Sequence, residues 1–220
     1  MSWHSLNAIG TVYVEAEQVC QGSPRMHNGK RCASTTFYVD GHKGACGCGP
    51  DNNDNQFSWN HDHLVTAPSQ HFFDSHGKTW CGGACGKCIK LTTTGGYVNG
   101  QGSHVPAGQS HVFMVTNLCP NEYPNLSWCN QSPGNGYKNQ YGYGEHFDLE
   151  NGAGQIDAIG WKGKNPEVTW EWSSCHGLNS TISKLNVLND PKRPENMITR
   201  VQVWGNFVQP PKGTCRLSVE

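Results

Sequence analysis

The sequence His146-Phe147-Asp148-Leu149 guides the interpretation of the rest of the chain. Successive side chains of an extended strand point to opposite faces, so the two apolar residues would face a core while His146 and Asp148 project from the other side. A second acid, Asp40, ends the β-branched and aromatic segment 33–39, which also predicts a strand. Two carboxyl groups on separate strands are the minimum for hydrolysing a glycosidic bond. The alternative is that Asp148 is a solvated strand residue and that Asp40 opens a turn.

Composition limits the classes of protein that fit the chain. Its 220 residues suffice for one large domain with a real core. The formal net charge of -1 gives no reason to expect binding to nucleic acid or to a membrane surface. No run of eighteen apolar residues is present, so no membrane-spanning helix is expected. The 27 glycines and 8 tryptophans, with only 15% charged residues, indicate a chain rich in turns and strands.

The distribution of strand-like segments predicts an all-β barrel with long loops. Only 67–74 reads as a helix, and it is short. No helix-length periodic segments alternate with the strands, which argues against a βαβ architecture. We expect an N-terminal extension at 1–19, one catalytic domain at 20–177, and a C-terminal extension at 178–220 that packs on it. Further strands are expected at 11–16, 89–94, 111–117, 155–161, 168–173 and 198–204.

Eleven cysteines are spread over the whole chain, which indicates a disulfide framework formed in an oxidising environment. We therefore expect a secreted, extracellular protein. The first residues contain neither a basic segment nor an apolar one, so we expect the signal peptide to be absent from this chain. The count is odd, so at least one thiol lacks a partner within the chain.

Two cysteine clusters invite a metal interpretation, and in both cases disulfides explain the residues better. Cys81, Cys85 and Cys88 have a spacing used for iron–sulfur clusters, but such a cluster needs a reducing compartment. Cys46 and Cys48 lack the second pair of ligands that structural zinc prefers, despite three nearby histidines, His42, His61 and His63. No Gly-x-Ser-x-Gly motif supports a nucleophilic triad. We expect no metal and no organic cofactor.

Several aromatic residues occur in turns rich in Gly and Asn, where burial of all of them is difficult. Flat rings beside amide side chains suit a sugar polymer, because the apolar faces of the sugar rings stack on them. The alternative is that most tryptophans fill the core, and it applies at least equally to Trp170 and Trp172. The candidates for sugar contact are Trp59, Trp128, Trp161 and the loop tyrosines, among them Tyr143.

Five segments resemble glycoside hydrolase family 45, specifically its invertebrate-type branch, subfamily B. The similarity covers about residues 20–175. The resemblance implies a six-stranded double-psi β-barrel with disulfide-stapled loops and few short helices. It also implies an endo-β-1,4-glucanase that inverts the anomeric carbon. Separately, we expect a monomer. The matching segments are Cys32-Ala-Ser-Thr-Thr-Phe-Tyr-Val-Asp40, Gly44-Ala-Cys-Gly-Cys-Gly49, Cys88-Ile-Lys-Leu-Thr-Thr-Thr94, Val115-Thr-Asn-Leu-Cys-Pro-Asn121 and Tyr141-Gly-Tyr-Gly-Glu-His-Phe-Asp-Leu-Glu150.

The same resemblance assigns roles to individual residues. It implies that Asp148 is the general acid and Asp40 the general base, with Tyr38 near the sugar being cleaved. Asn117 matches a position that another branch is thought to use in orienting water. Thr36 and His146 complete the expected substrate-binding set. Asp148 must then hold its proton near neutral pH, and candidate anions that would help are Glu145, Glu150 and Asp40.

The resemblance also implies disulfide pairs and shows two departures. Segment 130–144 contains no carboxylate where the fungal branch has an aspartate, and Glu145 is the nearest substitute. Cys48 and Cys81 compete for Cys215, and we favour Cys81. The implied pairs are Cys20 with Cys32, Cys46 with Cys85, Cys88 with Cys175, and Cys119 with Cys129. The alternative function is that of an expansin-like, non-hydrolytic glucan-binding or wall-loosening protein, which the presence of Asp40 disfavours.

Overall fold

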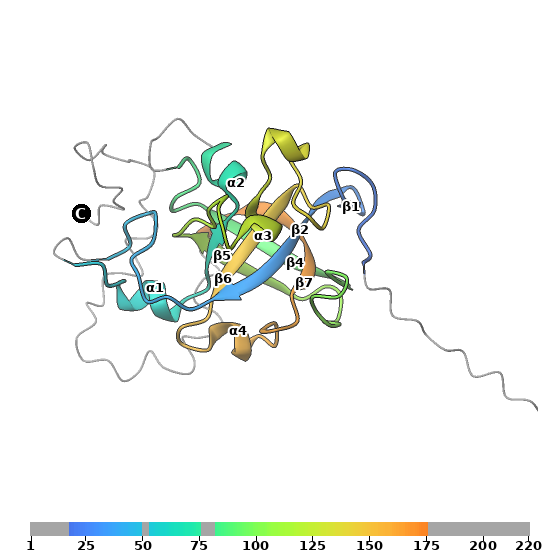
Figure 1. The fold of residues 1–220 in the computed structure, drawn as a ribbon. Helices are drawn as coiled ribbons and strands as arrows, with labels where there is room; N and C mark the ends of the chain where they lie inside the picture. The colour runs from blue at the N-terminus through green and yellow to red at the C-terminus, as the bar shows by residue number, and fades with distance from the viewer. Residues whose placement is uncertain (1–17, 50–52, 76–81, 176–220) are drawn as a thin grey trace, which may run out of the picture.

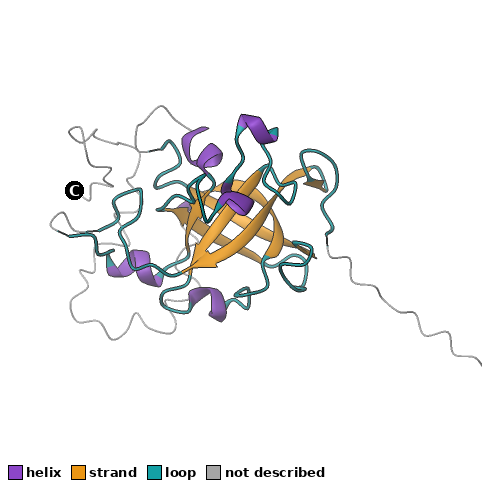
Figure 2. Cartoon of the chain, viewed as in Figure 1, coloured by secondary structure: helices purple, strands orange, loops and turns teal. Residues whose placement is uncertain are grey.

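The computed structural model describes residues 18–49, 53–75 and 82–175. The expected strands at 11–16 and 198–204 lie outside these residues, as does the expected C-terminal extension. Within the described segments, strands form the centre of the molecule and short helices lie around it (Figure 2).

Six strands close into a ring, and this confirms the predicted all-β, six-stranded double-psi barrel. The sheet order is β1-β2-β6-β3-β5-β4-β7, and an additional pairing of β2 with β7 closes it. The two-residue strand β1 (Met26–His27) is an antiparallel addition to the edge of β2. The ring consists of β2 (Lys30–Tyr38), β6 (Glu145–Glu150), β3 (Val65–Pro68), β5 (Ser110–Val115), β4 (Cys88–Tyr97) and β7 (Pro166–Ser173).

Two pairs of neighbouring strands in the ring are parallel. β2 runs parallel to β6, and β3 runs parallel to β5, whereas the other ring pairings are antiparallel. Figure 1 shows β2 and β6 side by side across the front of the barrel. Because the β2–β6 pair joins segments more than a hundred residues apart, it brings segment 33–38 beside segment 145–150.

The main core forms on one face of β6, as the sequence alternation predicted. Phe147 and Leu149 are 0% and 1% exposed and belong to the largest cluster of buried hydrophobic residues. Phe72 packs edge-on against Phe147, with the ring centroids 5.0 Å apart. The apolar residues therefore fix the orientation of β6, and the polar residues between them must face the other side.

In the part of the chain that the structure describes, four short α-helices and one 3₁₀ turn connect the strands: α1 (Ser58–Asp62), α2 (Gln70–Ser75), α3 (Leu126–Cys129), α4 (Gln155–Ala158) and η1 (Pro133–Asn135). None of the helices in the described segments is long and apolar enough to cross a membrane.

One prediction at a helix was wrong, and another was confirmed except for where the helix starts. Segment 155–161, expected as a strand, begins with α4, because the side chain of Asn151 accepts hydrogen bonds from the N–H groups of Ile156 and Asp157. The helix expected at 67–74 starts only at Gln70, because 67 and 68 still pair with β6 as part of β3.

The four expected disulfides are present: Cys20–Cys32, Cys46–Cys85, Cys88–Cys175 and Cys119–Cys129. They confirm the pairing that the resemblance implied. Cys48 carries a free, buried thiol, while Cys81 and Cys215 lie outside the described residues. The proposed pairing of Cys81 with Cys215 stays a prediction.

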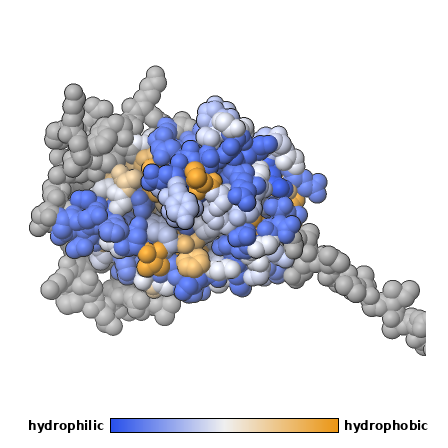
Figure 3. All heavy atoms as spheres, viewed as in Figure 1, coloured by the Kyte–Doolittle hydropathy of each residue, from blue (hydrophilic) through white to orange (hydrophobic). Residues whose placement is uncertain are grey.

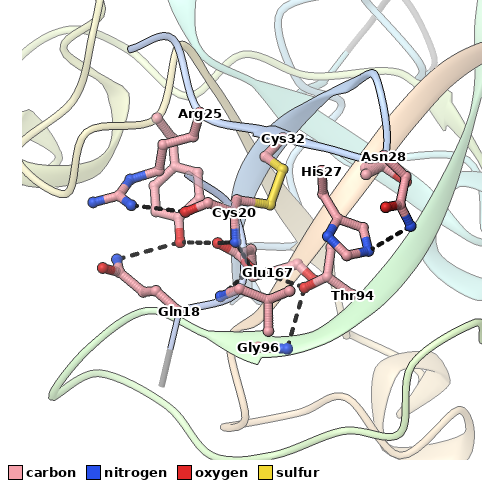
Figure 4. Close-up of a disulfide and its surroundings, with 12 residues drawn as sticks. Gln18, Cys20, Arg25, His27, Asn28, Cys32, Thr94, Gly96 and Glu167 are labelled. Carbon is pink, nitrogen blue, oxygen red and sulfur yellow. Dashed lines mark hydrogen bonds between the residues drawn. A yellow bond between two sulfur atoms is a disulfide. The ribbon is translucent and has the colours of Figure 1, made fainter. Parts of the chain in front are cut away.

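A buried carboxylate ties the start of the described chain to the barrel. Glu167 on β7 is 0% exposed, and its oxygens accept hydrogen bonds from the backbone N–H groups of Val19 and Cys20 (Figure 4). The hydroxyls of Thr94 and Tyr143 donate to the same carboxylate at 2.8 Å each. Next to this cluster, the Cys20–Cys32 disulfide links the segment covalently to β2. Every oxygen of Glu167 is therefore satisfied, as a buried charge requires.

Candidate active site

The polar residues of β2 and β6 form two parallel rows on the face opposite the core. The register pairs Ser34 with His146, Thr36 with Asp148, and Tyr38 with Glu150. Paired positions on neighbouring strands point to the same face, and residues two apart on one strand do so as well. All six side chains therefore share one side of the barrel wall. The alternation along 146–149 predicted that His146 and Asp148 share one face. The strand register adds the β2 residues and Glu150 to that face.

Asp148 lies half-buried at the centre of these rows. The Thr36 hydroxyl donates a hydrogen bond to its carboxyl oxygen Oδ1 at 2.7 Å. Burial raises the pKa of Asp148 to about 7, and the negative charges of Glu150 and Asp40 contribute to this increase, against the opposing effect of the Thr36 hydrogen bond. A carboxyl group with this pKa carries a proton through the mildly acidic range, which is what a general acid requires.

His146 is not exposed, and this corrects its expected place among the substrate contacts. The ring is 0% exposed, with Nδ1 2.9 Å from Ser34 Oγ and Nε2 3.0 Å from Thr36 Oγ1. Thr36 has one hydroxyl hydrogen, which Asp148 accepts, so His146 Nε2 must donate to Thr36. Burial lowers the pKa of His146 to about 3, which keeps the ring neutral. His146 therefore orients Thr36, and through it Asp148.

This hydrogen-bonded chain extends into the loop before β6. The side-chain amide of Asn139 donates to Ser34 Oγ at 2.9 Å, which leaves the Ser34 hydroxyl free to donate to His146. The Asn139 carbonyl oxygen accepts hydrogen bonds from the backbone of Tyr141 and Tyr143. The loop at 130–144 is thus connected to the acid through side chains, although it contains no carboxylate of its own.

Asp40 is exposed and lies just beyond the end of β2. Its Oδ1 accepts a hydrogen bond from the backbone N–H of His42 at 3.0 Å, which fixes the turn that follows the strand. The charge of Asp40 raises the pKa values of Tyr38, Asp148 and Glu150. Asp40 follows Tyr38 by two residues, and its electrostatic effect on these three groups agrees with a place near that end of β2.

Asn117 is held in one orientation beside Tyr38. Its carbonyl oxygen accepts hydrogen bonds from the N–H groups of Ala45 and Leu118, at 2.8 and 2.9 Å. The NH₂ group must therefore point the other way, and it hydrogen-bonds the Tyr38 hydroxyl. Gly44, at a φ of +70°, leaves the space for this side chain, because a Cβ there would lie 2.7 Å from Asn117 Cγ.

Trp128 lies close to the acid, whereas Trp59 packs elsewhere. The half-buried Trp128 ring on α3 packs with Tyr38 against a small core, and its centroid is 5.4 Å from that of His146. This place agrees with a sugar contact near Asp148. Trp59 on α1 is half-buried against the main core and 6.3 Å from Phe57, centroid to centroid.

Trp161 and Tyr143 are buried, which corrects their expected role in sugar binding. Trp161 is 1% exposed, and its indole N–H donates to the side chain of Gln109. Tyr143 is 0% exposed and donates its hydroxyl to Glu167. Loop position alone was a poor guide here, because both rings fold back under the loops that carry them.

Glu150 is a member of the site that our sequence analysis named only as a possible anion. It is 0% exposed, and its charge acts on both Asp148 and Tyr38. The alternation of His146, Asp148 and Glu150 along one strand was the signal that would have identified it. Glu145, also buried, faces the other side and is not among the charges that shift Asp148.

The described residues give no support to the two metal interpretations. Cys46, Cys85 and Cys88 are each part of a disulfide. Ligand atoms of Cys119, Cys129 and His146 lie within 4.8 Å of one another. Those two sulfur atoms are bonded to each other, however, and both ring nitrogens of His146 contact hydroxyls. A thiolate set able to bind a metal is therefore not available among them.

The surface on the side of β2 and β6 is mostly hydrophilic, with hydrophobic residues in small separate patches (Figure 3). The large hydrophobic side chains that remain exposed include Phe37, Val39, Tyr123 and Leu126. Such a face suits a polar ligand with limited apolar surface better than a broad hydrophobic partner.

Comparison with known proteins first defines the class. Residues 33–180, which are more than half of the chain, match the family model described as EXPB1-like domain 1, so the chain belongs to this family of domains. An endoglucanase of Mytilus edulis is 60% identical over 158 residues, which are 72% of this chain and 86% of the relative.

Solved structures narrow the assignment. The β-1,4-D-endoglucanase Cel45A of the blue mussel Mytilus edulis is 59% identical, with a TM-score of 0.68, over 74% of this chain and 89% of its own. The GH45 endoglucanase EG27II, in complex with cellobiose, is 50% identical, with a TM-score of 0.65, over 72% of this chain and 90% of its own. The chain belongs to glycoside hydrolase family 45 and is a glycoside hydrolase of the endoglucanase type. The predicted family is thereby confirmed.

Proposed function

We propose that this protein hydrolyses internal β-1,4-glucosidic bonds of cellulose and related glucans with inversion, using Asp148 as general acid and Asp40 as general base. One observation supports these roles above the others. The buried carboxyl has a pKa raised to about 7, and the exposed carboxyl is close enough to contribute to that increase. Pairs of carboxyl groups in different environments are the usual basis for dividing acid and base roles.

The environments of the two acids determine which role each takes. Asp148 retains its proton and is oriented by Thr36, so it can protonate the leaving glycosidic oxygen. Asp40 is exposed to water, so it can accept a proton from an attacking water molecule on the opposite face of the sugar. Inversion requires the two carboxyl groups to be about 6.5–9.5 Å apart, with room for that water. The carboxamide of Asn117, held beside Tyr38, would help to orient the water.

The substrate follows from the relatives and from the aromatic residues near the acid. The relatives are named as endoglucanases, and the structure of EG27II contains cellobiose. The half-buried rings of Tyr38 and Trp128 would contact the sugar on either side of the bond that is cleaved. The disulfide framework fits a monomeric enzyme that acts outside the cell, where insoluble glucan is found.

The test uses two Asp→Asn variants and a matched control. Asp148→Asn should reduce the release of reducing ends from carboxymethyl cellulose at least about a hundredfold, with binding of oligosaccharide largely retained. Asp40→Asn should cost less, because Asn117 can still position water. Asp74→Asn, an exposed acid on α2, serves as the control and should be fully active. More than a few percent of activity in Asp148→Asn would contradict the proposed acid. Equal losses in the two site variants would argue against help from Asn117.

The stereochemical outcome provides a separate test. An inverting enzyme releases the α-anomer first from a β-linked oligosaccharide, and ¹H NMR during the first minutes of hydrolysis distinguishes the anomers. Initial release of the β-anomer would exclude Asp40 as a general base. The match to EXPB1-like domain 1 makes non-hydrolytic glucan binding the second candidate. Binding of glucan with no release of reducing ends from any soluble β-1,4-glucan would favour it.

A further inference from the structure

Glu150 has an unusual hydrogen-bonding state for a buried acid. It is the last residue of β6, and its side chain is 0% exposed. Oε1 accepts a hydrogen bond from the backbone N–H of Gly152 at 2.9 Å. Oε2 is buried, and no residue that the structure describes donates to it at close range. Burial, and then the charge of Asp40, raise the pKa of Glu150, whereas hydrogen bonds from Gly152 and from the Tyr38 side chain lower it. Leaving a buried carboxylate oxygen without a partner costs stability, so the arrangement calls for an explanation.

The turn after β6 holds this carboxylate in place. A Cβ at Gly152 would lie 2.7 Å from Glu150 Oε1 and 2.7 Å from His61 Nε2. Only glycine leaves room there for the close approach of the backbone N–H, the carboxylate and the imidazole. The position of Glu150 is thus determined by the backbone on one side and by α1 on the other.

The groups that face Glu150 come from three elements. From β2 and its end come Tyr38, directly paired with Glu150 in the strand register, and Asp40. From β6 comes Asp148, two residues earlier on the same face. From α1 comes His61, whose charge opposes the others. Glu150 therefore lies among two further acids and a neutral phenol, a concentration of acidic groups that is typical of functional sites.

We propose that Glu150 is a positioning residue of the active site, a third carboxylate that fixes Tyr38 and, when ionised, places a negative charge behind the general acid. The inference rests on the proposed roles of Asp148 and Asp40, and it adds a residue to them. Glu150 does not contact the substrate in this scheme. It acts through Tyr38 on the position of the sugar, and through its charge on the proton of Asp148.

The electrostatic consequence has a definite sign. A nearby negative charge disfavours the ionised form of an acid, so ionised Glu150 keeps the proton on Asp148 to higher pH. The other groups around Asp148 are the neutral His146 on β6, Thr36 and Tyr38 on β2, Ala67 on the adjacent strand β3, and the charge of Asp40. Removing the charge of Glu150 should lower the pKa of Asp148, and the alkaline limb of the activity profile should move to lower pH.

The experiment compares Glu150→Gln with Glu145→Gln across the pH range. Both residues lie on β6, both are buried, and each has an Oε2 atom without a partner in the described residues. They differ in the face that they occupy, and Glu145 is not among the charges acting on Asp148. In Glu150→Gln the alkaline limb of kcat/KM should move down by about 0.5–1 pH unit. Activity at pH 7 should fall several-fold. Glu145→Gln should leave the limb in place.

Two outcomes would overturn the inference. One is an unchanged alkaline limb in folded Glu150→Gln, with folding checked by its thermal unfolding midpoint. The other is the same movement in both variants. If Glu150→Gln does not fold, Glu150→Asp replaces it, because it keeps the charge while withdrawing the carboxylate from Tyr38. It should retain the wild-type limb but raise KM, and a shifted limb in that variant would equally contradict the proposal.

The result is separable from the test of the general acid. Loss of activity in Asp148→Asn with no effect of Glu150→Gln would contradict the positioning role of Glu150 and leave the proposed function intact. Substantial activity in Asp148→Asn would remove the proposed function itself. Tyr38→Phe gives an independent check. If Glu150 acts partly through the Tyr38 hydroxyl, the KM effects of Tyr38→Phe and Glu150→Gln should be less than additive in the double variant.

Discussion

Glu167 is a buried acid and Asp148 a half-buried one on different walls of the same barrel, and their surroundings differ sharply. Glu167 on β7 accepts hydrogen bonds from two backbone N–H groups and two hydroxyls. Asp148 on β6 accepts a hydrogen bond from the Thr36 hydroxyl and one from the backbone of Leu149, and it has two like charges nearby. A carboxylate whose oxygens already accept all the hydrogen bonds that they can is a structural anchor. An incompletely satisfied one has oxygen and proton available for chemistry.

The largest expected effect concerns the anchor. Glu167→Ala leaves Val19, Cys20, Thr94 and Tyr143 without their acceptor, so it should lower the free energy of unfolding by about 3–5 kcal/mol. Urea unfolding followed by tryptophan fluorescence measures this.

The control for Glu167→Ala is Glu171→Gln, on the same strand but with a side chain that is 38% exposed and paired with Lys30 and Lys90. It should change stability little, because exposed ion pairs contribute little. Should both variants unfold at the same urea concentration as wild type, the distinction between an anchor and a solvated carboxylate on β7 would fail.

The next largest effect concerns Asp148, because its replacement by Asn should increase the stability of the protein at neutral pH. The pKa of Asp148 is about 7 in the folded protein and near 3.9 in an unfolded chain. A raised pKa means that its stabilising contribution is complete below about pH 4 and is lost as pH rises to about 7. Asp148→Asn has no such loss. Its stability relative to wild type should therefore increase from pH 4 to pH 7, by on the order of 2 kcal/mol, and then level off.

Thermal unfolding of wild type and Asp148→Asn at pH 4, 5.5, 7 and 8 checks this prediction. A difference that does not grow with pH would mean that Asp148 titrates in the native state as it does in the unfolded chain. The environment of Asp148 would then have no effect on pH-dependent stability, and its contrast with Glu167 would fail.

A smaller effect concerns the single hydrogen bond that Asp148 accepts from a side chain. Thr36→Val keeps the shape of the residue but removes the donor, so the pKa of Asp148 should rise. The alkaline limb of kcat/KM should move up by about 0.5–1 pH unit, opposite to the direction expected for Glu150→Gln. The value of kcat should also fall, because the acid loses its orientation. Movement of the two limbs in the same direction would contradict the electrostatic description of the site.

The smallest effect concerns Cys48, a buried ionisable group that belongs to neither region. Burial raises the pKa of its thiol, so the reactive thiolate is scarce at neutral pH. We expect iodoacetamide to leave Cys48 unmodified in the native protein, with activity unchanged, and to label it after unfolding. A nonreduced digest should contain one peptide pair linking Cys81 to Cys215. A disulfide-linked Cys48 would overturn this assignment.

The strand pattern of the barrel could be predicted from local sequence because its physical cause is local. Alternation of apolar and polar residues in 146–149 orients β6, and β-branched residues mark 33–39, 89–94 and 168–173 as strands. Helix α4 was missed because the hydrogen bonds that begin it come from Asn151, outside the segment, so no local pattern in 155–161 shows it. The burial of Trp161 was missed for a related reason, since a loop's path over the core depends on the whole fold.

The sequence by itself determined that Asp148 lies on a strand of a disulfide-stapled barrel, that Asp40 follows the end of another strand, and that Phe147 and Leu149 turn inward. Only the tertiary structure decided what surrounds those acids. The parallel register of β2 and β6 sets Thr36 beside Asp148 and Tyr38 beside Glu150. Burial and neighbouring charge then raise the pKa of the acid. Solvent exclusion and the distances between charges arise only when the chain is packed, so no local stretch of sequence shows them.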